Sequence, residues 1–164
     1  MKPALILVPA IAVMMSGCVS LSRSETTQAM SAAEASGGRI EAITVARSKP
    51  LKVTPEFDDL FKARVKAKTD ACATGSRPLR LETTLDRFDK ANVAMTAIIG
   101  GANVLRGKAR LIDVRTGKTV GTYNIGKTVV GGRIGVIQMA EAEEQLSDAF
   151  GEELCTQAFP KPTS

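Results

Sequence analysis

The chain has 164 residues, a length typical of one domain, and its 44% hydrophobic and 24% charged residues are ordinary values for a globular protein. It contains no histidine, so the commonest general base and the commonest metal ligand are both missing. Lysine and arginine exceed aspartate and glutamate by 22 to 17, a mild excess that suits a protein near anionic lipid or polymer but does not demand such a partner.

Residues 1–17 have the features of a signal peptide. Lys2 supplies a positive charge, and residues 4–15 form an apolar run that is interrupted only by Pro9. This run is shorter than the about 20 apolar residues that a membrane-spanning helix needs, and it has the length of a signal-peptide core. The sequence Met-Ser-Gly-Cys at 15–18 then places two small residues before a cysteine.

This Met-Ser-Gly-Cys sequence resembles the lipobox of bacterial lipoproteins, in which a large apolar residue, a small residue and Gly or Ala precede the Cys. The resemblance covers the leader alone, and Met15 stands where Leu is usual. It implies cleavage before Cys18 and covalent attachment of acyl chains, including palmitate, to that residue, which would hold the protein on a lipid bilayer. The alternative is an ordinary secretory leader in which Cys18 is incidental.

The same resemblance implies a location. Lipoproteins with Asp after the lipidated cysteine stay in the inner membrane, whereas this chain has Val19. We therefore expect an outer-membrane anchor with the domain in the periplasm. Apart from the covalent lipid on Cys18, no cofactor is expected.

Residues 18–38 are expected to be the lipidated cysteine and a flexible tether. The segment 20–38 is rich in Ser, Thr, Ala and Glu, has no periodic apolar face, and ends in two glycines. A coiled chain of this length spans on the order of 25 Å. We expect one folded domain over 39–159 and a disordered tail at 160–164.

Apolar periodicity predicts three elements in the first half of that domain. A strand is predicted at 39–47, and the Thr-Pro-Glu sequence at 54–56 predicts the start of a helix that ends before Gly75. Apolar and polar residues then alternate over 79–86, which predicts a half-buried strand.

The second half begins with an ambiguous segment, 91–103, whose small apolar residues and glycines allow a helix, a loop or a bent strand. Strands are predicted at 104–114 and 119–130, joined by a hairpin turn at 115–118, and a helix is predicted from about 134 to 158. The expected fold is therefore α+β: an antiparallel sheet of about four strands with two helices on one face, in the order β-α-β-β-β-α.

The segment 97–121 resembles small uncharacterised proteobacterial outer-membrane lipoproteins. In them a Gly-rich run, a strand that ends in Asp, a Thr-Gly-Lys turn and a second strand follow one another, as do Gly100-Gly101, Asp113 and the Thr-Gly-Lys sequence at 116–118 here. In outline such proteins are similar to the penicillin-binding-protein activator lipoprotein and to the amino-terminal domain of TolB. The resemblance implies no functional residue.

Two further cysteines, Cys72 and Cys155, remain after Cys18. They are an even number in the oxidising compartment that the leader implies, so we predict a disulfide between them. The alternative is a pair of buried free thiols. Two cysteines without histidine are too few for a metal site, and none is expected.

Known catalytic and nucleotide-binding motifs are weakly represented. Residues 121–128 match the phosphate-loop pattern G-x-x-x-x-G-K-[ST], but they lie in a predicted strand with no helix after them, so no nucleotide site is expected. Without histidine no familiar catalytic triad can be assembled. The acid pairs Asp58-Asp59 and Asp86 with Asp89 are expected to be solvated caps, and we do not expect an enzyme.

One surface feature has chemical content. Arg106, Lys108 and Arg110 alternate along one predicted strand and so project from one face, with Lys118 across the turn. Such a row can bind phosphate or carboxylate groups, although a solvated outer sheet face has the same pattern. No aromatic residues are interleaved with these cations, so nucleic acid is not an expected partner.

Two functional hypotheses follow. The favoured one is a membrane-anchored, non-catalytic accessory module that docks on another envelope protein through the segment 91–103. The other is a module that binds an anionic envelope polymer, peptidoglycan or lipopolysaccharide, through the basic row. If neither surface binds a partner, the acidic outer face of the last helix is the remaining candidate.

Overall fold

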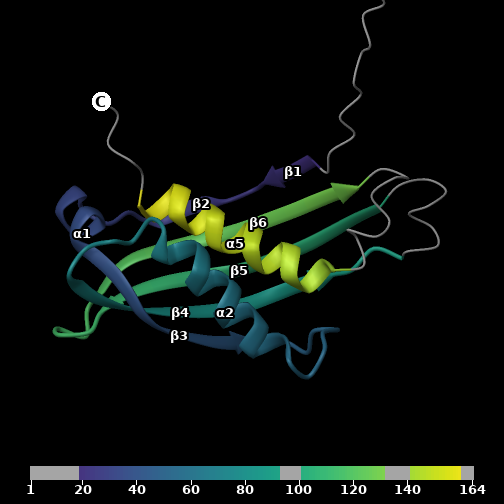
Figure 1. Cartoon of the computed structure of the whole chain (residues 1–164), viewed down its shortest axis with the longest axis horizontal. Coiled ribbons are helices and arrows are strands. Elements are labelled where there is room, and N and C mark those ends of the chain that lie inside the picture. Colours follow the sequence, from purple (N-terminus) through teal and green to yellow (C-terminus); the bar gives the residue numbers. More distant parts are fainter. Residues whose placement is uncertain (1–18, 93–100, 132–140, 160–164) are drawn as a thin grey trace, which may run out of the picture.

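The computed structural model of the chain describes residues 19–92, 101–131 and 141–159. They form one sheet of six strands with three helices (Figure 1). The strands are β1 (Val19–Ser22), β2 (Glu25–Gln28), β3 (Gly38–Arg47), β4 (Arg77–Asp89), β5 (Gly101–Asp113) and β6 (Thr119–Gly131). The helices are α1 (Ala32–Gly37), α2 (Phe57–Asp70) and α5 (Ala142–Ala158).

The strands lie in the order β1-β6-β5-β4-β3, and β2 also pairs with β6. All pairs are antiparallel except β3 and β4, which are parallel. The expectation of a purely antiparallel sheet is therefore wrong for this pair. Parallel neighbours need a long crossover, and the connection that contains α2 provides it, so β3, α2 and β4 form a β-α-β unit.

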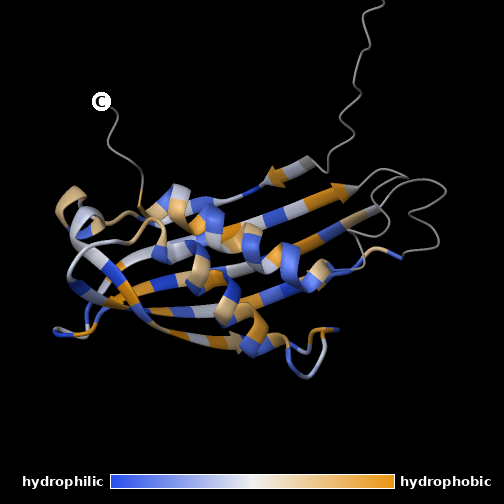
Figure 2. Cartoon of the chain, in the orientation of Figure 1, coloured by the Kyte–Doolittle hydropathy of each residue, from blue (hydrophilic) through white to orange (hydrophobic). Residues whose placement is uncertain are grey.

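The helices α2 and α5 cover one face of the sheet, as predicted, and the order β-α-β-β-β-α is confirmed from β3 to α5. Hydrophobic and hydrophilic residues alternate along the long strands (Figure 2). The hydrophobic residues of one face pack against the helices, where Phe57, Phe61 and Phe150 form edge-on and tilted ring contacts. The rest of this core is largely aliphatic, with Phe88, Tyr123 and Phe159 as further aromatic members.

The segment expected to be a flexible tether is folded in the structure. β1 and β2 both pair with β6. Ser31 is the N-cap residue of α1, and its side chain and that of Glu34 cap the helix reciprocally. The backbone amide of Met30 donates a hydrogen bond to the buried Tyr123 hydroxyl, 3.2 Å away. Polar contacts hold this segment in place, and apolar periodicity does not report such contacts. The sheet consequently has six strands rather than four.

Other boundaries also differ from the expected ones. Residues 101–103 of the ambiguous segment belong to β5, and β4 extends beyond the predicted 79–86 at both ends. The Thr54 hydroxyl does not cap α2 but donates to Glu143, 2.6 Å away. Residues 93–100, the start of the predicted last helix at 134–140, the leader with Cys18, and the tail at 160–164 lie outside the described residues.

A disulfide joins Cys72, just after α2, to Cys155 in α5, with 5.8 Å between their Cα atoms. The predicted pairing is therefore confirmed in the structure, and it fixes the C-terminal ends of the two covering helices to each other. Within the described part of the chain, no helix is long and apolar enough to cross a bilayer.

Candidate functional site

Among the residues that the structure describes, no helix covers the face of the sheet opposite α2 and α5, and the predicted basic row lies on this face. Leu105, Ala109 and Leu111 of β5 are buried under the helices, so Arg106, Lys108 and Arg110, which alternate with them, lie on the uncovered face. The predicted orientation of the row is confirmed. The ability of this row to bind an anion depends on the charged residues that surround it.

A β-bulge in β4 brings further charges beside Arg106. Leu85 pairs with Gly107 and Arg87 pairs with Arg106, so that Asp86 is an extra residue on the bulged strand. Both Asp86 and Arg87 are exposed, while Leu85 is buried under the helices. The bulge thus turns two successive charged residues toward solvent next to the middle strand.

Gly107 allows the strands to approach closely at this bulge. A Cβ atom at this position would lie 2.7 Å from Leu85 Cδ2 and 3.0 Å from the Thr84 carbonyl oxygen. With alanine here the Leu85 methyl group would have to move aside and the Thr84 carbonyl oxygen would have to give by a few tenths of an ångström, so the added atom would press on both strands.

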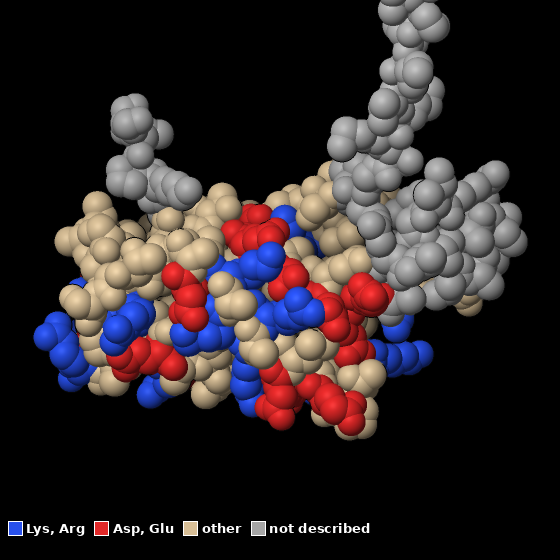
Figure 3. Space-filling model, in the orientation of Figure 1, with Lys and Arg blue, Asp and Glu red and all other residues tan. Residues whose placement is uncertain are grey.

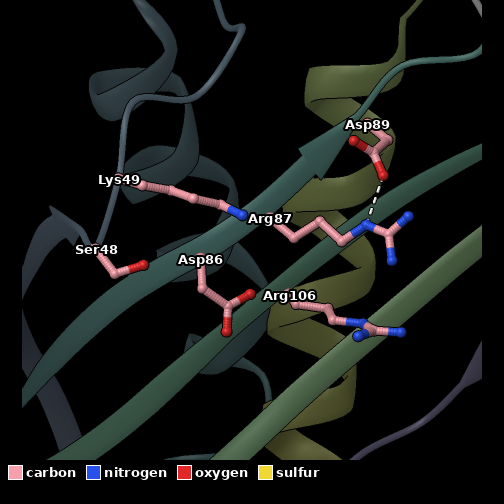
Figure 4. A pocket seen from close by; sticks show the side chains of 6 residues that line it. All are labelled: Ser48, Lys49, Asp86, Arg87, Asp89 and Arg106. Atoms are coloured by element: carbon pink, nitrogen blue, oxygen red, sulfur yellow. Dashed lines mark hydrogen bonds and ion pairs between the residues drawn. The ribbon is translucent and has the colours of Figure 1, made fainter.

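The bulge forms one wall of a hollow of about 580 Å³ on the uncovered face (Figure 4). Its lining residues are Ser48, Lys49, Asp86, Arg87, Asp89 and Arg106. The backbone amide of Ser48 donates a hydrogen bond to the Leu85 carbonyl oxygen, 2.9 Å away. This bond holds the chain that follows β3 beside the bulge of β4. We call this cavity the basic hollow.

A second hollow of about 270 Å³ adjoins the basic hollow and shares Asp86 and Arg106 with it. It adds Arg23, which follows β1 and whose backbone amide donates to the Gly126 carbonyl oxygen, 2.8 Å away. A Cβ at Gly126 would lie 2.8 Å from the Arg23 carbonyl oxygen, so a glycine is needed where the chain passes this close. Arg106 therefore lies between cations from three separate segments.

Cations outnumber carboxylates in the two hollows. Arg23, Lys49, Arg87 and Arg106 face two acids, Asp86 and Asp89. Arg87 forms an ion pair with Asp89 over 2.5 Å, which is the dashed contact in Figure 4.

Two cations of β5 differ from Arg87 in this respect. Among the residues that the structure describes, neither Arg106 nor its neighbour Lys108 forms an ion pair. Lys108 pairs with Thr84 on one side and Asn124 on the other, so no acid faces it across the sheet. The charge of these two residues is consequently available to an anion from outside.

The far end of the basic row is different. Arg110 lies opposite Glu82 and forms an ion pair with it over 3.4 Å, and it also donates a hydrogen bond to the Thr119 hydroxyl over 3.0 Å. Glu82 also pairs with Arg80 over 3.1 Å. Arg110 is therefore partly neutralised within the sheet, and it is the least available of the three cations in the row.

Lys118 lies at the end of the row in the predicted hairpin turn, which is confirmed. The turn is held by Asp113, whose carboxylate accepts hydrogen bonds from the amide and hydroxyl of Thr116, and by Gly117 with a φ of 68°. Lys118 is exposed, but in the described residues its side chain has no ion pair and no contact with the basic row. It belongs to the turn rather than to the hollows.

Asp113 itself is a buried carboxylate with a firm partner. The hydrogen bond from Arg77, together with those from Thr116, holds the pKa of Asp113 at about 2, although burial opposes this shift. Asp113 therefore remains ionised at neutral pH, and its role is to fix the end of β5 and the turn.

The acidic face of the last helix is not a free surface. The space-filling view of the helix-covered side shows acidic and basic side chains interleaved over α2 and α5 (Figure 3). Arg64 forms ion pairs with Glu144 and Asp148, and Lys68 forms them with Asp148 and Glu152. These carboxylates join the two helices, so they are already paired within the domain and this third candidate surface is not favoured as a binding site.

Sequence reasoning missed Arg23, Lys49, Asp86 and Arg87 as neighbours of Arg106. A signal for the bulge exists in Leu85-Asp86-Arg87-Phe88, where two charged residues interrupt the alternation of apolar and polar positions. Asp86 and Asp89, expected to be solvated caps, are exposed members of β4, and both line the basic hollow. No local sequence pattern indicates that the segment after β3, with Lys49, and the segment after β1, with Arg23, both lie next to Arg106.

The side chains that line the two hollows include groups of the kind that binds anions. Guanidinium and ammonium groups donate strong hydrogen bonds to phosphate and carboxylate oxygens, and arginine matches such groups with two parallel bonds. Among the described residues, no cluster of three metal-ligating side chains is present. The match to the phosphate-loop pattern lies within β6, as expected, with strand and not loop geometry.

No family model and no curated protein matches the sequence. Solved structures are similar in fold. A PelC dodecamer from Paraburkholderia phytofirmans aligns with a TM-score of 0.53 at 13% identity, covering 87% of this chain and 100% of that one, and a variant of the same protein aligns with 0.50 at 16%, covering 85% and 98%. A Xanthomonas campestris protein of the DUF330 family aligns with 0.51 at 13%, covering 71% and 81%. At these identities the likeness shows the shared fold alone.

Proposed function

We propose that this chain is a lipid-anchored, non-catalytic binding module of the bacterial cell envelope, and that it binds anionic polymer at the basic hollow. The observation that carries the proposal is the convergence of Arg23, Lys49 and Arg106 on the uncovered sheet face, beside Lys108, in excess of the carboxylates there. Peptidoglycan and lipopolysaccharide both present carboxylate or phosphate groups, which are the ligands such a surface recognises.

The anchoring part of the proposal rests on the leader. The sequence at 15–18 resembles a lipobox, and the disulfide between Cys72 and Cys155 is of the kind that persists in an oxidising compartment such as the periplasm. The outer membrane is the proposed location because Val19, and not Asp, follows the cysteine. The covalent lipid on Cys18 is the only non-protein group in this proposal.

The non-catalytic part rests on the residues of the hollows. Arginine stays protonated and cannot serve as a general base, and the Ser48 hydroxyl donates to the Leu85 carbonyl oxygen over 3.4 Å rather than to a base. A surface built from cations with few partners favours binding over proton transfer. Nucleic acid and metal ions have no place in the proposal.

The test compares two double variants with the same change in charge. Arg106→Gln with Lys108→Gln removes the two cations without an ion pair, whereas Lys62→Gln with Lys66→Gln removes two cations of α2 that pair with Asp59 and Asp70. In cosedimentation with purified peptidoglycan sacculi and in titration with lipopolysaccharide, the first pair should weaken binding about tenfold, or about 1.4 kcal/mol.

The control pair should bind like the wild type, and raised salt should weaken binding by the wild type and by the control. Equal binding by both double variants would contradict the assignment of the basic hollow. The anchor is tested separately with Cys18→Ser. This variant should be released from membranes, or should remain as the uncleaved precursor without lipid.

A second candidate function, docking of an envelope protein, has its own observation. β3 is an edge strand of ten residues, and within the described residues its outer edge pairs with no other strand. A long open edge can accept a strand from a partner. The segment 91–103, on which the sequence-based docking hypothesis rested, lies largely outside the described residues, so the edge of β3 is the surface to test.

Thr44→Lys with Ala46→Lys would place charges on exposed positions of this edge strand, which discourages strand addition. If a protein partner docks there, a crosslinker placed at Ala42 should capture it in intact cells, and the two lysines should abolish the capture. The Arg106→Gln with Lys108→Gln variant should leave that capture unchanged, which separates the two functions.

A further inference from the structure

The described chain begins in a strand rather than in a flexible tether. β1 begins at Val19, so the residue proposed to carry the lipid comes directly before a strand that pairs with β6. The backbone amide of Gly126 donates a hydrogen bond to the Ser24 hydroxyl over 3.3 Å, and the backbone amide of Arg23 donates to the Gly126 carbonyl oxygen over 2.8 Å, which holds this end of the chain on β6. No spacer is left between the domain and the anchor.

The surface next to this point is apolar. Leu21 is 52% exposed and Val130 is 37% exposed, and they are two of the three large hydrophobic side chains with high exposure among the described residues. Val130 follows the buried Val129 in β6, so its side chain lies on the uncovered face. Leu21 pairs with Thr128, two residues before Val130, and therefore lies on the same face in the neighbouring strand. In β5, Ala102 and Val104 continue the same two rows across the sheet.

Charges begin one row further from Cys18. Arg106 pairs with Gly126, and Arg23 bonds to the backbone of the same glycine, so both cations lie in the row after Val104 and Leu21. The one acid in the apolar rows is Asp89, opposite Val104, and it is paired with Arg87. An apolar strip bordered by cations matches the boundary between acyl chains and headgroups of a bilayer.

We propose that the lipid bilayer covers this strip, so that the end of the sheet where β1 and β5 begin and β6 ends rests on the membrane and the long strands lead away from it. This proposal rests on lipidation of Cys18, which belongs to the proposed function. Leu21 lies three residues beyond the anchor, about 10 Å along an extended strand, which is within the depth that interfacial groups reach. The basic hollow then faces the polar surface of the same leaflet.

The opposite end of the sheet provides an internal control. Val114, the third exposed large hydrophobic residue at 48%, follows the end of β5. About 30 Å of strand separates Val104 from Asp113, so Val114 should remain in water if the strands lead away from the bilayer. If the sheet lay flat on the membrane, Val114 and Leu21 would both reach it.

The test uses the absence of tryptophan from the chain. Leu21→Trp, Val130→Trp and Val114→Trp each introduce a single fluorophore at an exposed position. The lipidated proteins are reconstituted in vesicles of phosphatidylethanolamine and phosphatidylglycerol, with and without bromine on the acyl chains. Bromine should quench emission from Leu21→Trp and Val130→Trp at least about twofold more than from Val114→Trp.

Equal quenching at all three positions, or none at Leu21 and Val130, would overturn the proposal. Mass spectrometry of the Cys18 peptide separates the possible failures. If Cys18 carries lipid and Leu21→Trp still reports water, only the membrane contact fails. If Cys18 carries no lipid, the anchor fails as well.

A second measurement needs no substitution. Radical footprinting of the wild-type protein in the same vesicles should label Val114 and spare Leu21 and Val130. Labelling of Leu21 and Val130 to the same extent as Val114 would contradict the contact independently of how the tryptophan variants fold.

Discussion

Lys127 of β6 and Glu153 of α5 form a buried ion pair, with 3.2 Å between Nζ and Oε2 and only 9% and 8% of the two residues exposed. Burial alone would raise the pKa of Glu153, but hydrogen bonds from Ser22, Gln157, Ser24 and Lys127 outweigh it and lower the pKa. This carboxylate thus connects β6 to the last helix, next to the N-terminal strand that pairs with β6.

We expect Glu153→Gln to destabilise the fold by about 3 kcal/mol, because it leaves the Lys127 ammonium buried without its counter-charge. The neighbouring Glu152 is the control, since its pair with Lys68 is exposed and Glu152→Gln should cost less than about 1 kcal/mol. Chemical denaturation gives both free energies of unfolding. Equal effects of the two substitutions would show that the buried pair does not hold the fold.

The disulfide supports a prediction on stability. Its two cysteines are separated by 83 residues, so breaking it should lower the free energy of unfolding by at most about 4.5 kcal/mol on the chain-entropy model. Denaturation of the wild type with and without reductant measures this loss. The variant with both Cys72→Ala and Cys155→Ala should be as unstable as the reduced wild type and should not respond to reductant.

The lowered pKa of Asp113 predicts that the free energy of unfolding depends on pH in the acidic range. Its pKa of about 2 in the folded state lies below its ordinary value of 3.8, because of the hydrogen bonds from Arg77 and Thr116. The stabilisation is therefore complete above about pH 4 and is lost as the pH falls toward 2. Asp113→Asn should be less stable than the wild type at neutral pH, and the difference should shrink through this interval. A constant difference across these pH values would contradict the role given to ionised Asp113.

Gly107→Ala tests the close approach that forms the bulge. The added methyl group would press on Leu85 and on the Thr84 carbonyl, so we expect a loss of about 1–3 kcal/mol and weaker binding at the basic hollow. Gly37 is the matched control, because a Cβ there has nothing within 4 Å. Gly37→Ala should leave stability within about 0.5 kcal/mol of the wild type or raise it slightly. If the two substitutions behave alike, the bulge does not depend on a glycine.

Local sequence patterns predicted the elements from β3 to α5 because each of them carries its own signal. Alternation marked the strands, and the Thr-Gly-Lys sequence at 116–118 marked the hairpin turn. The same alternation put Arg106, Lys108 and Arg110 on one face, since side chains in a strand point to opposite sides in turn. The count and context of the cysteines were enough to pair Cys72 with Cys155.

Contacts between distant segments decided the rest. The segment around β1 and β2 has no apolar period, and it is ordered by hydrogen bonds that join Ser24 to Gly126 and Met30 to Tyr123, partners that lie about 90 residues or more along the chain. The sequence by itself determined which positions are buried in each strand, because burial follows a local period. Only the tertiary structure decided that Arg23, Lys49 and Arg87 join Arg106, because a bulge, a crossover and an edge strand must first bring them to one face.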